Sequence, residues 1–393
     1  MRRPQLQALT GLRFFAAAHV VVYHYGRRLG WHEGPWSRVL DHGFAGVTLF
    51  FVLSGFILIY SHGAGERSGS TREFWVARFA RIYPVYLLGL LLALPALVFP
   101  PGAPARVPDA VVLAASPLLL QAWVPRLAGE WNGPAWSLSA EAFFYALFPV
   151  LAFGILRLRR RGALLSAAAA WGVSLGLVTA YVLIQPDGAV RPGMPTAAAP
   201  WLGYLRYHPV ARLPEFVLGM AVGRLYLLRA GDPLSRRDRR LSDVAATLAL
   251  LASLAIVASP VALPFPMVHG GLLGPLFALA FYALARANGL GLLSRLLGSG
   301  LVVRLGEASY ALYILHVPVH GLLERGLASV GWHPTPVFFF AIYLATALAA
   351  STVVYSTFEL PARRRLRAWL GGSHGRDLAR GTPAEVADSQ AAA

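Results

Sequence analysis

The sequence predicts an all-α fold, a polytopic transmembrane bundle of about ten helices with both termini in the cytoplasm. Three observations predict it. Only 13% of the 393 residues are charged and 56% are hydrophobic, whereas soluble proteins carry roughly 25% charged residues. The apolar residues recur in stretches long enough to cross a bilayer, and the mean hydropathy is +0.56. The 35 basic residues, all arginine, gather mainly at the ends of these stretches. This pattern indicates membrane orientation, with the lipid bilayer and not a nucleic acid as partner.

We expect the membrane helices in the following order along the chain. They cover approximately residues 6–26, 44–61, 83–99, 135–156, 164–184, 210–228, 241–259, 264–285, 303–323 and 336–358. With the N-terminus inside, the densest arginine groups, including those of residues 157–161 and 236–240, fall on the cytoplasmic side. The run from Ala110 to Trp123 is short and contains Pro117, so we expect it to be re-entrant or interfacial.

The chain divides into a transmembrane domain, residues 1–368, and a tail, residues 369–393, whose few apolar residues predict disorder in the cytoplasm. The basic residues before the first helix are followed by no small-residue cleavage site, so we expect this helix to be retained. We therefore expect a multi-pass protein of the cell membrane. The absence of cysteine excludes disulfides, thiol nucleophiles and thiolate metal ligands.

The first helix carries Arg13, His19 and His24, and ionisable groups within a membrane usually mark function. Arg13 and His24 are eleven positions apart, which places them about 20° apart around a helix and roughly 16 Å apart along it. They therefore share one face, in opposite halves of the membrane. His19 points elsewhere and is interpreted as a packing residue. The alternative is that Arg13 reaches the inner surface and His24 lies at the outer one, without chemistry.

A second polar group surrounds the fourth helix. Trp136 suits a membrane interface, and Ser137, Ser139 and Glu141 offer hydroxyls and a carboxylate near the outer surface. Alternatively, Ser137 or Ser139 caps the first turn of the helix.

Arg78 and Arg81, three positions apart on one helical face, are placed to bind a phosphate from the cytoplasm, although setting topology alone also explains them. Ser54 and Gly55 allow close helix approach within the second helix, and packing is the favoured interpretation there. His316 and His320 are four positions apart without a supporting cysteine or carboxylate motif, so we expect a cavity or hydrogen-bonding role and no metal.

Seven segments of the sequence resemble segments of a known protein family. They are LTGLRFFAAAHVVVYH with Arg13 and His24, GVTLFFVLSGFIL, REFWVARFARIYPVYLL with its Arg-x-x-Arg, AWSLSAEAFFYALFP, RLPEFVLGMAVGRL around Glu215, SYALYILHVPV around Tyr310 and His316, and FELPARRR around Glu359. In this order, from residue 9 to about 365, the chain resembles the acyltransferase 3 family. These are membrane O-acyltransferases that modify surface polysaccharides and, in some actinomycetes, macrolides.

The resemblance implies an enzyme that transfers an acyl group other than an aminoacyl group, most simply an acetyl group from acetyl-CoA, with no permanently bound cofactor. The acyl-CoA donor would come from the cytoplasm, and the acceptor would be a hydroxyl of a polysaccharide, glycolipid, peptidoglycan or macrolide. Arg13, Arg78 and Arg81 would receive the donor, and His24 would act as general base or transient acyl carrier. Glu141 would orient His24.

The predicted substrate-binding side chains are those of Arg78, Arg81, Ser54, Trp136, Ser137, Glu215, Tyr310 and His316. Thr48 departs from many members, which have aspartate at this position, so Glu141 is expected to support His24 instead. The chain stops soon after the tenth predicted helix, so we expect no esterase-like domain of the kind that some members append, and the membrane domain itself would complete the transfer.

Two other functions remain open from the residues. One is a transporter of an acylated or anionic metabolite, against which stands the absence of an internal repeat and of paired broken helices. The other is a scaffold for envelope assembly, which would tolerate the loss of both Arg13 and His24.

Overall fold

The fold is that of a computed structural model, which describes residues 5–29, 34–63, 70–99, 109–188, 198–261 and 263–370. These ranges contain helices and connecting turns and no strand, which confirms the all-α class. Most of the predicted tail, residues 371–393, lies outside the described residues.

Among its described residues, the first half of the chain forms seven α-helices and four short 3-10 turns. They are α1 (Gln7–Tyr25), η1 (Gly26–Leu29), α2 (Gly34–Asp41), α3 (Ala45–His62), α4 (Thr71–Val98), α5 (Ala110–Ala115), η2 (Gln121–Trp123), η3 (Pro125–Leu127), η4 (Gly133–Ala135), α6 (Trp136–Arg157) and α7 (Arg160–Ile184). The second half contains α8 (Pro200–Tyr207), α9 (Pro209–Leu227), α10 (Arg236–Ala258), α11 (Phe265–His269), α12 (Gly274–Ala287), α13 (Leu292–Leu297), α14 (Gly300–Glu307), α15 (Ser309–Ser329), α16 (Pro336–Val354), the π-turn η5 (Tyr355–Glu359) and α17 (Leu360–Leu370).

Within the described ranges, seven stretches are long and apolar enough to cross a membrane. They are α3, α4, Gly133–Arg157, α7, α10, Phe265–Ala287 and Pro336–Leu370. Several such stretches in one chain are expected of a multi-pass membrane protein. The helices α1, α9 and α15 have 19, 19 and 21 residues but are not among the seven. The predicted count of ten and the side on which the termini lie therefore stay predictions.

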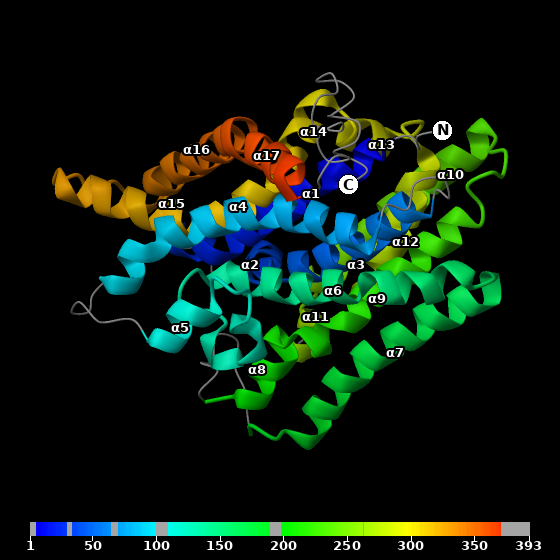
Figure 1. Ribbon diagram of the computed structural model, residues 1–393, viewed down its shortest axis with the longest axis horizontal. Coiled ribbons are helices and arrows are strands. Elements are labelled where there is room, and N and C mark those ends of the chain that lie inside the picture. The colour runs from blue at the N-terminus through cyan, green and yellow to red at the C-terminus, as the bar shows by residue number, and fades with distance from the viewer. Residues whose placement is uncertain are drawn as a thin grey trace.

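The helices differ in how deeply they lie in the bundle. In Figure 1, α3, α4 and α6 run near its middle, whereas α7 and α10 lie toward one margin. Burial agrees with this view, because 72% of the most apolar window of α3 is buried, against 22% in α7 and 28% in α10. The central helices therefore hold most of the side chains that are shielded from lipid.

Two glycines bring α3 and α9 into backbone contact. A Cβ atom added to Gly55 would lie 2.0 Å from the carbonyl oxygen of Phe216, and one added to Gly219 would lie 1.9 Å from that of Val52. Only glycine permits such an approach. This confirms the packing role predicted for Gly55.

Two predicted helices are broken. The helix expected at 264–285 consists of α11 and α12, separated at Gly271, whose φ of +92° is favoured by glycine. The break leaves the carbonyl of His269 to accept bonds from the side chains of Arg212 and Thr48. The helix expected at 303–323 likewise consists of α14 and α15, which meet at Ala308.

Three predicted helix ends are also wrong, because charged residues continue the helices beyond the apolar stretches. Ser70 and Glu73 form a capping box that starts α4 at Thr71, before the predicted start at residue 83, so Arg78 lies well inside this helix. Ser235 and Asp238 start α10 in the same way, before the predicted start at residue 241, so its first turns contain the arginines of residues 236–240. At the other end of the chain, helical structure continues through η5 and α17 to Leu370.

The run from Ala110 to Trp123 contains only α5, a turn and η2. Neither element is long enough to cross a bilayer. Its re-entrant position stays a prediction.

Candidate active site

A cavity of about 300 Å³ lies between α1, α3, α4, α6, α15 and the η5–α17 segment. Its lining collects polar side chains from across the chain. They are Gln5, Thr10, Arg13, Ser54, Arg78, Arg81, Ser137, Glu141, Tyr145, Glu307, Ser309, Tyr310, Tyr313, Tyr355, Glu359, Arg363 and Arg364. The structure thus brings together seven of the predicted site residues, which are spread along the sequence from Arg13 to Tyr310.

The carboxylate of Glu141 lies at the junction of α3 and α6. Ser54 Oγ donates a hydrogen bond of 3.0 Å to Glu141 Oε1. The hydroxyl of Tyr145, one turn further along α6, donates to the same oxygen. Two donors therefore hold one oxygen of this carboxylate in place within the cavity wall.

Arginines dominate the charge of the cavity. Five of them line it, against the three carboxylates of Glu141, Glu307 and Glu359. Arg78 is only 5% exposed, and its guanidinium lies 5.8 Å from the ring centroid of Tyr145. Among the described residues, the Nε atoms of Arg78 and Arg364 are buried without a hydrogen-bond partner. Buried cations and unsatisfied donors are costly, so the cavity is suited to an anionic ligand.

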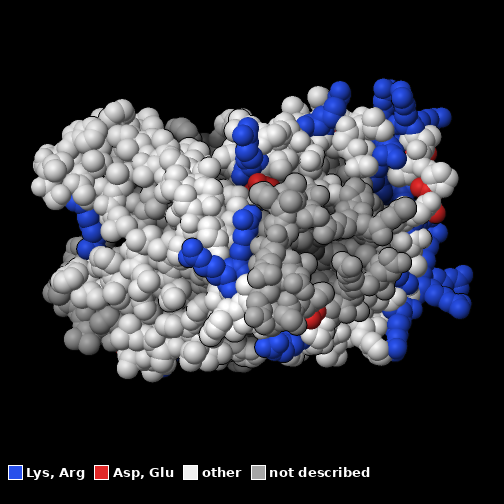
Figure 2. Space-filling view, turned by 45° about the horizontal axis from the view of Figure 1, so that its top comes forward, with Lys and Arg blue, Asp and Glu red and all other residues white. Residues whose placement is uncertain are grey.

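The basic character extends to the surface. On the face drawn in Figure 2, most arginine side chains lie over one half and the middle of the molecule, with few acidic residues among them, and the other half is nearly uncharged. Such an asymmetric distribution is typical of a membrane protein with one arginine-rich side.

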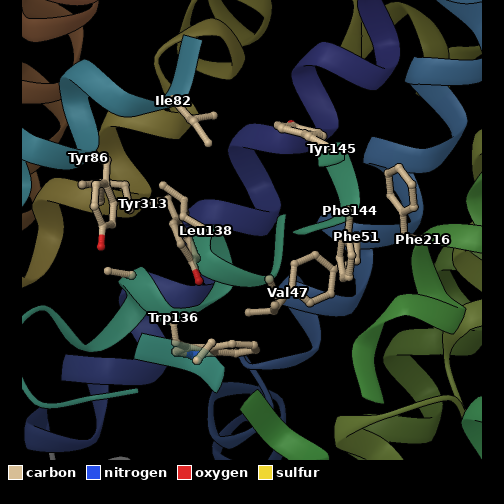
Figure 3. Close-up of a cluster of buried hydrophobic side chains, with 14 of the residues drawn as sticks. Val47, Phe51, Ile82, Tyr86, Trp136, Leu138, Phe144, Tyr145, Phe216 and Tyr313 are labelled. Carbon is tan, nitrogen blue, oxygen red and sulfur yellow. The ribbon is translucent and has the colours of Figure 1, made fainter. Parts of the chain in front are cut away.

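Part of the cavity wall belongs to the rigid hydrophobic core. Figure 3 shows Val47, Phe51, Ile82, Leu138 and Tyr313, which belong to the largest buried cluster and also line the cavity. The cluster fixes the polar groups attached to it, because close-packed side chains have little freedom to move.

Two tyrosines of α15 join that helix to the facing wall. Tyr310 donates from its hydroxyl to the carbonyl of Ile82. The hydroxyl of Tyr313 lies 2.9 Å from Ser137 Oγ. The α15 side of the cavity is therefore tied to both α4 and the start of α6.

His24 lies beside His316 and not among the residues that line the cavity. Its Nδ1 is 3.0 Å from Nε2 of His316, and Nδ1 of His316 is 2.7 Å from the carbonyl oxygen of Tyr313. Tyr313 thus connects the histidine pair to the cavity wall. The expectation that Glu141 orients His24 is not met, because the partners of Glu141 are Ser54 and Tyr145.

Glu215 lies in a separate buried cluster with Thr48, Arg212 and His269. Arg212 Nη2 is 2.9 Å from Glu215 Oε2 and 3.0 Å from Thr48 Oγ1, and Arg212 Nη1 is 2.9 Å from His269 Nδ1. All four side chains are at most 5% exposed. The cluster ties α9 to α3 and α11, and Glu215 does not line the cavity as predicted for a substrate-binding residue.

The remaining predicted residues have mainly structural contacts. Trp136 is buried and packs edge-on against Phe51 and Tyr207. Ser137 donates to the carbonyl of Pro134, and Ser139 to that of Leu119, so neither caps α6. His19 contacts the carbonyl of Val39, as expected for a packing residue.

His320 stacks on the ring of Tyr25, with 3.8 Å between ring centroids. No group of three or more potential metal-ligating side chains occurs in the described part of the chain.

Sequence reasoning missed the contribution of Arg363 and Arg364. Both lie beyond the predicted end of the last helix at residue 358, yet α17 carries them into the cavity wall beside Glu359. The spacing of four between Glu359 and Arg363 is a signal for one shared helical face. This shared face was missed because the last helix was predicted to end at residue 358.

Comparisons with known proteins identify the family of the chain. The family model described as an acyltransferase domain matches residues 6–356. The chain belongs to the acyltransferase 3 family. It is an acyltransferase that transfers groups other than aminoacyl groups, as the resemblance implied.

Three curated relatives illustrate the family. The chain is 33% identical to acyltransferase MdmB of Streptomyces mycarofaciens, with 92% of each chain covered. It is 29% identical to the exopolysaccharide production protein ExoZ of Rhizobium meliloti, covering 88% of this chain and 96% of the relative. It is 25% identical to O-acetyltransferase OatA of Staphylococcus aureus, covering 92% of this chain and 57% of the relative. No solved structure matches the chain.

Proposed function

We propose that this protein is a membrane O-acyltransferase that moves an acyl group, most simply acetyl, from cytoplasmic acyl-CoA to a hydroxyl of a carbohydrate or glycosylated acceptor at or across the membrane. The proposal rests on one observation, the cavity that is lined by five arginines from three separate helices.

Arg78, Arg81, Arg363 and Arg364 bind the phosphates of the donor. Guanidinium groups bind phosphate oxygens through paired, charge-assisted hydrogen bonds, which supply the partners that the Nε atoms of Arg78 and Arg364 lack. Arg13, which lines the same cavity from α1, receives the arm of the donor. The thioester then points toward Tyr313 and Ser137, at the His24 side of the cavity.

The chemistry requires one proton to move twice. His24 accepts the proton of the acceptor hydroxyl as this oxygen attacks the thioester carbonyl. The carbon–sulfur bond breaks, the CoA thiolate leaves, and His24 returns the proton to the sulfur. In the alternative route, His24 first takes the acyl group itself and then passes it to the hydroxyl. In either route the products are an ester and free CoA.

The orientation that suits this reaction is the one that the arginines predict. Ten crossings with both termini in the cytoplasm place Arg78, Arg81 and α17 on the cytoplasmic side and His24 toward the outer side. The donor and acceptor then approach from opposite faces of the membrane.

The acceptor class is inferred from the names of the relatives. One relative is an O-acetyltransferase and another serves exopolysaccharide production. A hydroxyl of an envelope glycan, a glycolipid or a glycosylated small molecule fits both.

The test uses inside-out membrane vesicles that contain the full chain and are supplied with acetyl-CoA labelled in the acetyl group. We expect label to become covalently attached to envelope or lipid material, and His24→Ala to abolish this at equal protein level. Label that enters the vesicle lumen without covalent attachment would identify a transporter and overturn the proposal.

A further inference from the structure

Two imidazole rings meet near the end of α1. Nδ1 of His24 lies 3.0 Å from Nε2 of His316, and the ring centroids are 5.0 Å apart. His316 is fully buried, whereas His24 is exposed. Only one of the two rings is therefore accessible to a substrate.

The protonation of His316 follows from its other nitrogen. Nδ1 of His316 lies 2.7 Å from the carbonyl oxygen of Tyr313, and a carbonyl can only accept, so Nδ1 carries the proton. A second proton on Nε2 would place a positive charge in a fully buried position, where the facing rings are those of His24, Tyr25 and Tyr313. Nε2 of His316 therefore holds a lone pair.

This lone pair decides which nitrogen of His24 is protonated. The nitrogen of His24 that faces it must donate, so the proton lies on Nδ1. The carbonyl of Val20, one turn earlier on α1, also faces this imidazole and is likewise an acceptor. The remaining nitrogen, Nε2, is then unprotonated.

We propose that His316 is a positioning residue that fixes the tautomer of His24, so that Nε2 of His24 is the atom that takes the proton of the acceptor hydroxyl. This inference rests on the proposed function, in which His24 reacts. It assigns to His316 the role that the sequence assigned to Glu141. A general base held by a third group is a recurring arrangement, because the wrong tautomer presents a proton where a lone pair is needed.

The backbone around His316 supports a fixed position. The hydroxyl of Tyr343 on α16 donates a hydrogen bond of 3.2 Å to the carbonyl oxygen of His316. Tyr313 holds its ring from the preceding turn of α15. Two helices thus set the orientation of the ring that faces His24.

The first experiment reads the tautomer without relying on activity. The full chain, labelled with ¹⁵N-histidine and held in detergent micelles, is examined by NMR, and the spectrum of His24→Gln identifies the His24 signals. We expect a one-bond N–H coupling at Nδ1 of His24 and none at Nε2. A proton on Nε2 of His24 in the unaltered protein overturns the inference, whether or not the protein transfers acyl groups from acyl-CoA.

The second experiment compares three variants. His316→Leu removes the acceptor, and His316→Gln keeps an acceptor oxygen at a similar reach. His320→Leu is the matched control, because His320 is buried one turn further on the same helix and stacks on Tyr25 rather than contacting His24. Loss of the partner that orients a metal-bound histidine typically costs about 10- to 100-fold in activity, and we expect an effect of this size for a histidine base.

We expect His316→Leu to lower kcat by about 10- to 100-fold with an unchanged KM for acyl-CoA, and to shift the His24 signals toward the other tautomer. His316→Gln should restore most of kcat and the Nδ1 signal. An equal loss of kcat in His320→Leu, or a failure of His316→Gln to restore activity in a folded protein, would show a packing role and contradict the inference. If His316→Leu does not fold, the tautomer in the unaltered protein and the kcat of His316→Gln still decide it.

Discussion

The hydroxyl of Ser54 donates a hydrogen bond of 3.0 Å to a carboxylate oxygen of Glu141, which joins α3 to α6 in the wall of the arginine-lined cavity. The two residues are 87 positions apart. The sequence around either residue does not predict this contact. The hydrogen bond nevertheless fixes the only carboxylate that α6 contributes to the cavity lining.

Replacing Ser54 by Ala should lower the rate of acyl transfer while leaving the protein folded. A hydrogen bond to a charged group contributes about 1.5–3 kcal/mol, so a rate loss of about tenfold or more is expected if the fixed position of Glu141 matters for the reaction. The measurement is label transfer from acetyl-CoA in vesicles. Ser61→Ala is the control, because Ser61 bonds only within the end of α3, to the carbonyl of Leu58 and to His62. Equal rates in the two variants would contradict the prediction.

Replacing Arg78 by Gln should weaken the binding of acetyl-CoA about 10- to 100-fold, because a charge-assisted contact to a phosphate is lost from a buried position. Equilibrium binding of labelled acetyl-CoA to the purified protein measures this without an acceptor. Arg240→Gln, at an exposed position of α10 outside the cavity, should bind as tightly as the unaltered protein. Unchanged affinity in Arg78→Gln would return this arginine to a role in topology alone.

Replacing Glu215 by Gln should destabilise the protein by about 3 kcal/mol or more, because it leaves Arg212 charged and 2% exposed without a counter-charge. The thermal midpoint in detergent measures the effect. Asp232→Asn, an exposed carboxylate in the turn after α9, serves as the control and should leave the midpoint unchanged.

Adding Thr48→Asp to Glu215→Gln should recover part of this stability. Thr48 Oγ1 is 3.0 Å from Arg212 Nη2, so an aspartate there supplies the missing negative charge. This is the residue type that many members of the family have at the position. A double variant less stable than Glu215→Gln alone would show that Arg212 does not need a carboxylate from α3.

Replacing Gly219 by Ala should separate α3 from α9 and lower stability by about 1–3 kcal/mol or more, since the new Cβ would lie 1.9 Å from the carbonyl oxygen of Val52. The thermal midpoint again measures it. Gly154→Ala on α6 is the matched control, because no atom lies within 4 Å of its added Cβ. This control should be neutral or slightly stabilising, because alanine favours a helix.

Most of the fold could be predicted because membrane helices are local features. Apolar length and arginine position specify them residue by residue, and α3, α6, α7 and α9 begin and end within four residues of the prediction. The predicted helices are wrong where contacts with other helices override the local sequence pattern. Gly271 looks like one glycine among many in an apolar run, and only its contact with Leu175 of α7, with a positive φ, makes it a break.

The candidate site, like the fold, could be predicted only in part from the sequence. The sequence by itself determined the chemical inventory: Arg13, His24, Arg78, Arg81 and Glu141 stand out because ionisable groups in apolar segments are costly and rare. Only the tertiary structure decided the pairing. It joined Glu141 to Ser54, His24 to His316, and the Arg212–Glu215 pair to Thr48 and His269. The physical reason is that helix geometry relates residues three or four positions apart, whereas partners on different helices depend on how whole faces pack.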